Sequence, residues 1–175
     1  LEHISVPNTI TRLWDYVFDK CTTLQEVTLP DGVTDIGRHV FESCCCITEM
    51  ISPKGLRKIG NGAFQGCRML EKAVLPDGID EVVDSLFSGC YTLTEIVIPK
   101  SVTTVSRYCF ENCQCMKRYY FLPDSPPELT TTGTFLGLPK DCKFYVPKGR
   151  LDVYQTAESW SSYASYMVEM EGDVP

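Results

Sequence analysis

The sequence is poor in histidine and in basic residues. Its two histidines, His3 and His39, stand in no catalytic or zinc-binding motif. Sixteen Lys and Arg residues against 23 Asp and Glu residues give a formal net charge of −7, whereas a nucleic-acid-binding domain usually has a basic surface. No apolar run approaches the roughly 20 residues that span a bilayer, and the first residues show no signal-peptide pattern. We therefore expect no enzyme, no cofactor, no nucleic acid and no membrane insertion.

The ten cysteines lack the paired spacing that zinc sites require, so we expect no metal. Small buried side chains in a stack explain a cysteine ladder best, because the surroundings are apolar. Disulfides between neighbours about 5 Å apart remain a second reading. Five of the cysteines recur at a step of 23 residues: Cys21, Cys44, Cys67, Cys90 and Cys113.

The same step of 23 residues recurs in two other columns of the sequence. One column is proline, at Pro7, Pro30, Pro53, Pro76 and Pro99. The other is phenylalanine, at Phe18, Phe41, Phe64, Phe87 and Phe110. Self-similarity at a fixed period of this length indicates a stacked repeat array.

Each repeat reads as a strand, a turn and a return segment. In LTEIVIP, residues 93–99, apolar residues alternate with others at period two, and proline ends the strand. Asp-Gly after the proline in two units predicts a tight turn. In NGAFQGC, residues 61–67, spacings of three to four predict a short helical or 3₁₀ return.

The repeat resembles the BspA-like class of leucine-rich repeats. Its pattern is LxxIxIP followed by V/I-T-x-I-G-x-x-A/V-F-x-G/S-C, as in 24–44 and 93–113, with Ser106 in place of the usual glycine. Residues 144–160 are similar to the segment that often closes such arrays. The resemblance implies a cell-surface or secreted location, with adhesion to host matrix proteins or other protein–protein binding.

We predict an α/β repeat fold: a right-handed leucine-rich-repeat solenoid with a parallel β-sheet on the concave face, short helical or 3₁₀ returns and a C-terminal cap. Residues 1–123 form the array, with five full units and part of a sixth. Residues 124–175 form a degenerate last repeat and the cap, with a strand over KFYVP at 143–147 and a short helix over 151–166. Because no capping segment precedes Leu1, we expect neighbouring repeats of a longer parent chain.

Positions 3 and 5 of each strand are expected to face outward and to form the partner-binding surface. Position 3 is charged and mostly acidic, and position 5 becomes apolar from the third unit. Solvation and β-propensity explain these two columns without a partner, whereas an exposed apolar stripe also marks interaction sites. The predicted partner-binding residues are Glu26, Thr28, Glu49, Ile51, Lys72, Val74, Glu95, Val97 and Tyr120.

The predicted function is a non-enzymatic protein–protein interaction module, part of a cell-surface or secreted adhesin that binds a host or matrix protein. A structural spacer within a larger surface protein is one alternative. A glycan-binding module is the other, because exposed aromatic rings suit sugars. The aromatic residues concerned are Tyr119, Tyr120, Tyr145, Tyr154, Trp160, Tyr163 and Tyr166.

Overall fold

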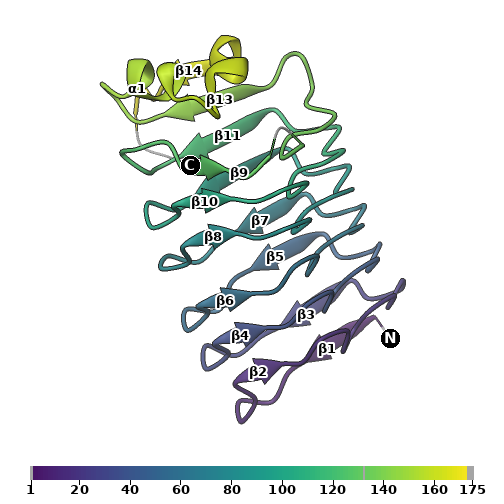
Figure 1. Cartoon of the computed structure of the whole chain (residues 1–175). Helices are drawn as coiled ribbons and strands as arrows, with labels where there is room; N and C mark the ends of the chain where they lie inside the picture. The colour runs from purple at the N-terminus through teal and green to yellow at the C-terminus, as the bar shows by residue number, and fades with distance from the viewer. Residues whose placement is uncertain (1, 132, 173–175) are drawn as a thin grey trace.

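The chain folds into a parallel-strand β-solenoid in which each turn of the coil carries two strands (Figure 1). The computed structural model describes residues 2–131 and 133–172. The longer strands form a first series along one side of the stack. They are β1 (His3–Ser5), β3 (Glu26–Thr28), β5 (Glu49–Ile51), β7 (Lys72–Val74), β9 (Glu95–Ile98), β11 (Arg118–Phe121), β13 (Lys143–Val146) and β14 (Met167–Glu169).

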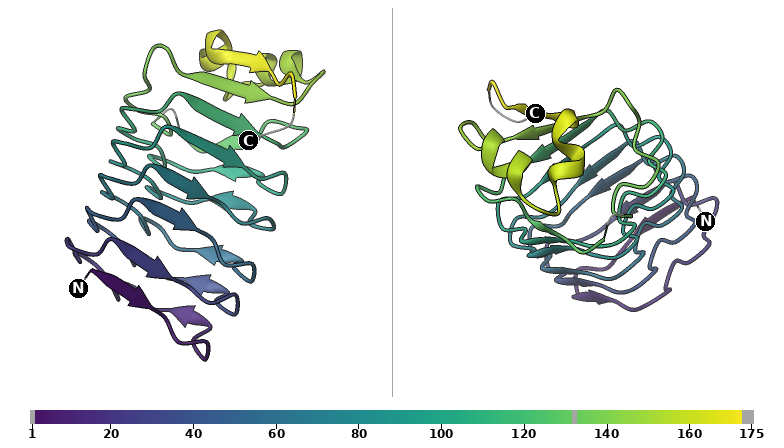
Figure 2. Two further views of the ribbon diagram at one scale, coloured as in Figure 1. Left: turned by 180° about the vertical axis from the view of Figure 1, so that it is seen from behind. Right: turned by 45° about the horizontal axis from the view of Figure 1, so that its top comes forward.

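A second series of two-residue strands follows the turn after the proline. Its members are β2 (Arg12–Leu13), β4 (Asp35–Ile36), β6 (Lys58–Ile59), β8 (Glu81–Val82), β10 (Thr104–Val105) and β12 (Glu128–Leu129). Every pairing in both series is parallel, and the register follows the sequence repeat, as in Glu49 opposite Lys72. The predicted repeat solenoid is therefore confirmed. The stack shows little bend along its length (Figure 2), and the concavity of the first series stays a prediction.

The core is built from the columns that the repeat predicts. Within each strand of the first series the middle residue points inward, so Met50 is buried while Glu49 and Ile51 are exposed. The phenylalanine column stacks ring on ring through the interior, with centroids 5.2 Å apart between Phe41 and Phe64 and 5.9 Å apart between Phe64 and Phe87. One turn cannot bury its apolar side alone, so this stacking between turns supplies the core.

The expected helical returns are wrong: the segments after the second strands are turns. Two residues in each return have a positive φ, such as His39 at 53° and Ser43 at 57°. A left-handed residue every fourth position breaks a helix. The backbone hydrogen bonds run to the next turn of the solenoid instead, as from Phe41 N to Ala63 O at 2.8 Å. The spacing of three to four thus reflects turns that are tied to their neighbours.

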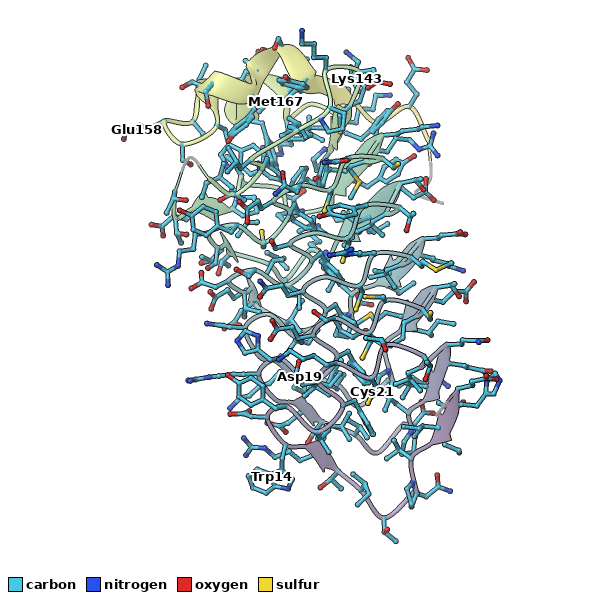
Figure 3. All side chains as sticks on the ribbon, turned by 90° about the vertical axis from the view of Figure 1, so that its right-hand side faces the viewer. Trp14, Asp19, Cys21, Lys143, Glu158 and Met167 are labelled. Carbon is cyan, nitrogen blue, oxygen red and sulfur yellow. The ribbon has the colours of Figure 1, made fainter. Side chains whose placement is uncertain are left out.

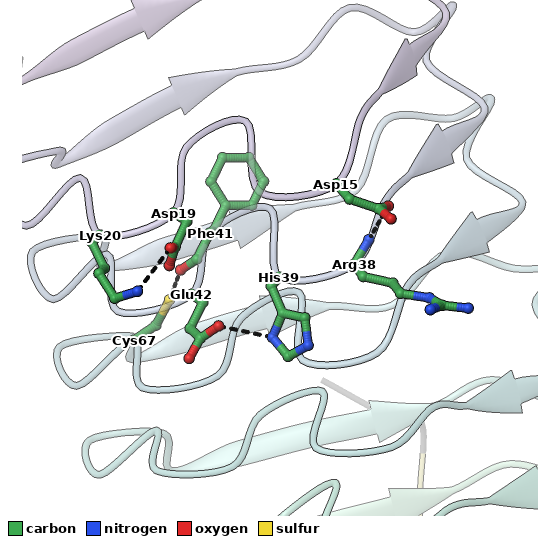
Figure 4. Close-up of polar contacts among 8 residues, drawn as sticks. All are labelled: Asp15, Asp19, Lys20, Arg38, His39, Phe41, Glu42 and Cys67. Atoms are coloured by element: carbon green, nitrogen blue, oxygen red, sulfur yellow. Dashed lines mark hydrogen bonds and ion pairs between the residues drawn. The ribbon is translucent and has the colours of Figure 1, made fainter.

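The cysteine ladder forms a directional chain of hydrogen bonds in the core. Cys67 Sγ donates to the carbonyl of Phe41 one turn earlier at 3.2 Å (Figure 4), and Cys90 repeats this contact to Phe64 at 3.2 Å. Sulfur atoms rise in a line from Cys21 (Figure 3). All ten cysteines are free thiols, which confirms the buried-stack reading over disulfides. Burial is also the main cause that raises the pKa of the Cys67 and Cys90 thiols well above the ordinary value.

The last turns close the stack with short helices and one more strand. The single helix expected over 151–166 is interrupted: α1 (Leu151–Thr156) and the 3₁₀ helix η1 (Ser161–Tyr166) flank Ala157, whose backbone is extended. The strand expected at 143–147 is confirmed as β13. Strand β14 pairs with β13 and was not expected. The segment after residue 123 thus continues both strand series, and the boundary at 123 stays a prediction.

The cap aromatics are buried, so the glycan hypothesis that depends on them is wrong. Trp160 and Tyr154 are fully buried, and Tyr119 is 1% exposed. The Trp160 indole N–H donates to the carbonyl of Pro127 at 2.6 Å, and the Tyr154 hydroxyl donates to Pro123 O at 2.8 Å. These rings supply apolar area to a cap core that also needs their polar ends, and they leave no exposed sugar platform.

Replacing Trp160 with phenylalanine is expected to lower the free energy of unfolding by about 1–3 kcal/mol. The substitution keeps a ring against Phe121 but leaves the buried Pro127 carbonyl without its donor. Urea unfolding followed by circular dichroism measures the change. Trp14→Phe is the matched control, since Trp14 is 67% exposed, and it should shift stability by less than about 0.5 kcal/mol. Equal effects of the two substitutions would contradict the role of the indole N–H.

Candidate functional site: the outer face of the first strand series

A charged column runs along the outer face of the first strand series at position 3 of each strand. Two neighbouring pairs within it are close: Arg118 Nη2 lies 2.7 Å from Glu95 Oε2, and His3 Nδ1 lies 3.3 Å from Glu26 Oε2. The hydrogen bond with Glu95 raises the pKa of Arg118, which therefore stays charged. Both pairs are solvent-exposed and add little stability. In chain order the column is His3, Glu26, Glu49, Lys72, Glu95, Arg118 and Lys143.

A second column at position 5 is apolar over most of its length. Ile51 is 64% exposed and Val74 is 44% exposed, which is unusual for side chains of this type. The register continues the column past Tyr120, whose ring stacks on that of Tyr145 with centroids 4.9 Å apart. Val168 of β14 follows Tyr145 in the same register. The column therefore ends two strands later than the sequence predicted.

The structure brings all nine predicted partner-binding residues onto this one face, along β3 to β11. Sequence reasoning missed Tyr145 and Val168. The first was within reach, because Phe144 and Val146 face inward and so place Tyr145 outward. Val168 carried no such signal, since β14 lies outside the repeat. That a partner binds these residues stays a prediction.

The sheet is interrupted between β3 and β5. Within the described residues these strands form no backbone pairing, whereas β1 pairs with β3 and β5 pairs with β7. A groove of about 570 Å³ opens there, and Glu26, Glu49 and Ile51 lie in its lining. A second groove of about 520 Å³ is lined by Val74 and Val97. The exposed apolar column thus borders two hollows that can receive side chains of a partner.

A third column of charges follows the loops at the end of the first series and borders the same grooves. Asp31 lies beside the first groove, and Lys54 and Asp77 lie beside the second. The sign alternates from turn to turn, and two neighbours form ion pairs, Lys100 with Asp124 at 2.8 Å and Lys54 with Asp31 at 3.8 Å. In chain order the column is Asp31, Lys54, Asp77, Lys100, Asp124 and Lys148. Sequence reasoning did not single it out.

The remaining surface offers little chemistry beyond this face. Among residues 2–131 and 133–172, no group of three or more His, Cys, Asp or Glu side chains is placed to hold a metal ion. Within the same ranges, no helix has the length and apolar character that a membrane span requires. His39 Nδ1 lies 2.9 Å from Glu42 Oε2, and its ring stacks on Tyr16 at 5.1 Å (Figure 4). These contacts join adjacent returns of the solenoid.

The family model for the BspA type leucine-rich repeat region matches residues 1–117 with six copies. The chain belongs to this family. No curated protein sequence matches it significantly. The family is one of repeat scaffolds, and the six copies agree with the 23-residue turns seen in the structure.

Solved bacterial structures share the fold. A leucine-rich repeat protein of T. pallidum is 24% identical, with a TM-score of 0.69, over 93% of this chain and 81% of that one. The pneumococcal vaccine antigen PcpA is 21% identical, with a TM-score of 0.71, over 99% of this chain and 42% of that one. A leucine-rich repeat protein of Bacteroides ovatus is 23% identical, with a TM-score of 0.57, over 85% of this chain and 46% of that one. The chain thus spans under half of two of these three relatives.

Proposed function

We propose that this chain is a non-enzymatic protein-binding module, part of a cell-surface or secreted protein, and that the outer face of the first strand series binds the partner. The exposed apolar column from Ile51 to Tyr145 is the observation that carries the proposal. Contiguous exposed apolar side chains beside charged ones are typical of protein interaction sites. The grooves beside Ile51 and Val74 offer pockets for anchoring side chains of a partner.

The family and one relative support a location outside the cell. PcpA is described as a vaccine antigen, and an antigen of that kind is accessible to antibodies. Host matrix and plasma proteins are therefore the partners to test first. The adhesin role rests on this argument and on the exposed face together.

Replacing both Val74 and Val97 with aspartate is expected to weaken partner capture at least ten-fold, because two charges enter the apolar column. The immobilised chain is exposed to matrix and plasma proteins, and bound protein is quantified at low and at high salt. A strong loss of binding at high salt would bring in the charged columns beside the apolar one.

Val153→Asp is the matched control for this experiment. Val153 is 43% exposed, close to Val74 at 44%, but it lies on α1 of the cap. It should leave capture unchanged. Capture that survives both valine substitutions intact would place the binding site elsewhere on the molecule.

A further inference from the structure

The charged strand column reads the same from either end when the signs are reversed. From β3 to β13 its charges run negative, negative, positive, negative, positive, positive. The six residues are Glu26, Glu49, Lys72, Glu95, Arg118 and Lys143. The midpoint of this pattern falls between β7 and β9.

The loop column has the same property about the same midpoint. Its signs alternate from Asp31 to Lys148, so reversing its order also reverses every sign. Asp77 and Lys100 flank the midpoint, just as Lys72 and Glu95 do in the strand column. Two independent columns therefore share one centre of inverted charge.

We propose that the outer face of the first strand series binds a second copy of this chain, with the two stacks running in opposite directions. The two-fold axis would lie parallel to the strands, between β7 and β9. This rests on the proposal that the face binds protein, and it names the partner. Rotation about such an axis keeps the strand direction, so each column faces its own counterpart in the second copy.

Every facing pair in the charged columns then has opposite signs. In the strand column, Glu26 faces Lys143 of the second copy, Glu49 faces Arg118 and Lys72 faces Glu95. In the loop column, Asp31 faces Lys148, Lys54 faces Asp124 and Asp77 faces Lys100.

The apolar column is matched as well. Ile51 faces Tyr120 of the second copy, and Val74 faces Val97. These contacts lie at the centre of the face and the charged columns flank them, as in an interface with an apolar middle and a polar rim.

Other positions of the axis place like charges together. With the axis on β7, Glu49 faces Glu95, and Lys72 faces itself. With the axis between β5 and β7, Glu26 faces Glu95. One turn further on, between β9 and β11, Lys72 faces Lys143. Charge complementarity therefore selects a single register.

The face is large enough for a stable but modest dimer. Eight strands at about 4.8 Å spacing give a length of roughly 38 Å, and a width of about 15 Å gives roughly 600 Å² per copy. That total of about 1,200 Å² is the lower end of specific interfaces. The stack has little bend (Figure 2), so two such faces can meet along their length. We expect a dissociation constant in the micromolar range.

Charge reversal tests the pairing in solution by sedimentation velocity over about 1–200 µM protein. One variant carries Glu26→Lys and Glu49→Lys, and the other carries Arg118→Glu and Lys143→Glu. Each variant alone has four repulsive contacts in place of attractive ones, so its self-association should weaken by about 30-fold or more. Mixing the two variants restores every opposite pair, so the mixture should form a heterodimer with wild-type affinity.

The control reverses two charges away from the face, with Glu128→Lys and Glu158→Lys, and should dimerise as the wild type does. Both residues are exposed, and the net charge changes as in the first variant. A wild-type chain that stays monomeric at 200 µM, or a mixture that fails to associate, overturns the dimer. Partner capture that depends on Val74 and Val97 in a monomeric chain would then leave the proposed function standing. Loss of that dependence would overturn the proposed function itself.

Discussion

Raising the pH from 8 to 10 is expected to lower the free energy of unfolding by several kcal/mol. Burial raises the pKa of the Cys67 and Cys90 thiols well above the ordinary value and that of Cys113 to about 12. An unfolded thiol titrates near pH 8.5, so above that pH the unfolded chain releases protons that the folded chain retains. Each such thiol then contributes about 2 kcal/mol in favour of unfolding at pH 10.

The sign of this effect fixes the pH window. Stability from the buried thiols is fully present below about pH 8.5 and is lost as the pH rises toward the folded pKa of about 12 for Cys113. Urea midpoints at pH 7, 8, 9 and 10 measure the loss. The curve should be flat from pH 7 to 8 and should fall steeply above it.

Neighbouring cysteines provide the control for the alkaline effect. Cys113→Ala should flatten the fall above pH 8.5, because alanine has no proton to lose. Cys115→Ala should leave the slope unchanged, since Cys115 is exposed. Identical slopes for these two variants would show that buried thiols do not cause the alkaline loss.

Replacing Phe64 with alanine is expected to cost about 3–5 kcal/mol of folding free energy. Phe64 is 3% exposed and stacks between Phe41 and Phe87, so its removal leaves a cavity with rings on both sides. Denaturant unfolding gives the total cost. Hydrogen exchange should show the largest loss of protection in the adjacent turns, because coupling in a solenoid runs between neighbours.

Two substitutions bracket this prediction. Tyr108→Ala removes a ring that is 42% exposed, and it should cost less than half as much as Phe64→Ala. Phe18→Ala removes the partly buried end of the same stack and should fall between the two. A uniform loss of protection along the whole chain after Phe64→Ala would contradict local coupling.

The fold was predictable because its columns are written in the sequence at one period. Leu24, Phe41 and Cys44 have counterparts in each later unit of the array, and all three are buried as the pattern predicts. The returns were mistaken for helices because their apolar spacing suits a helix as well as a turn. What decides between them is the hydrogen bond to the next turn, such as Ser43 N to Gln65 O at 2.7 Å. A local pattern carries no information about such a partner.

The candidate site was predictable in part, for related reasons. Alternation within each strand places Glu49 and Ile51 outward, and the structure agrees. The extension to Val168 was not predictable, because β14 follows two short helices and joins the sheet only through tertiary packing. The cap aromatics were misjudged because the sequence shows a ring such as Trp160 but not the Pro127 carbonyl that its N–H meets.

The equivalence of the turns lets the length of the molecule change in whole units. A copied or deleted stretch of 23 residues brings its own strand pair, ring and thiol, and each of these contacts the adjoining turn in the same way. The alternating loop charges add a condition that the core does not impose, since one unit more or less puts two equal signs side by side. Growth by pairs of turns preserves the alternation, whereas growth by single turns preserves only the fold. The number of repeats is therefore free for stability but tied to parity for the surface.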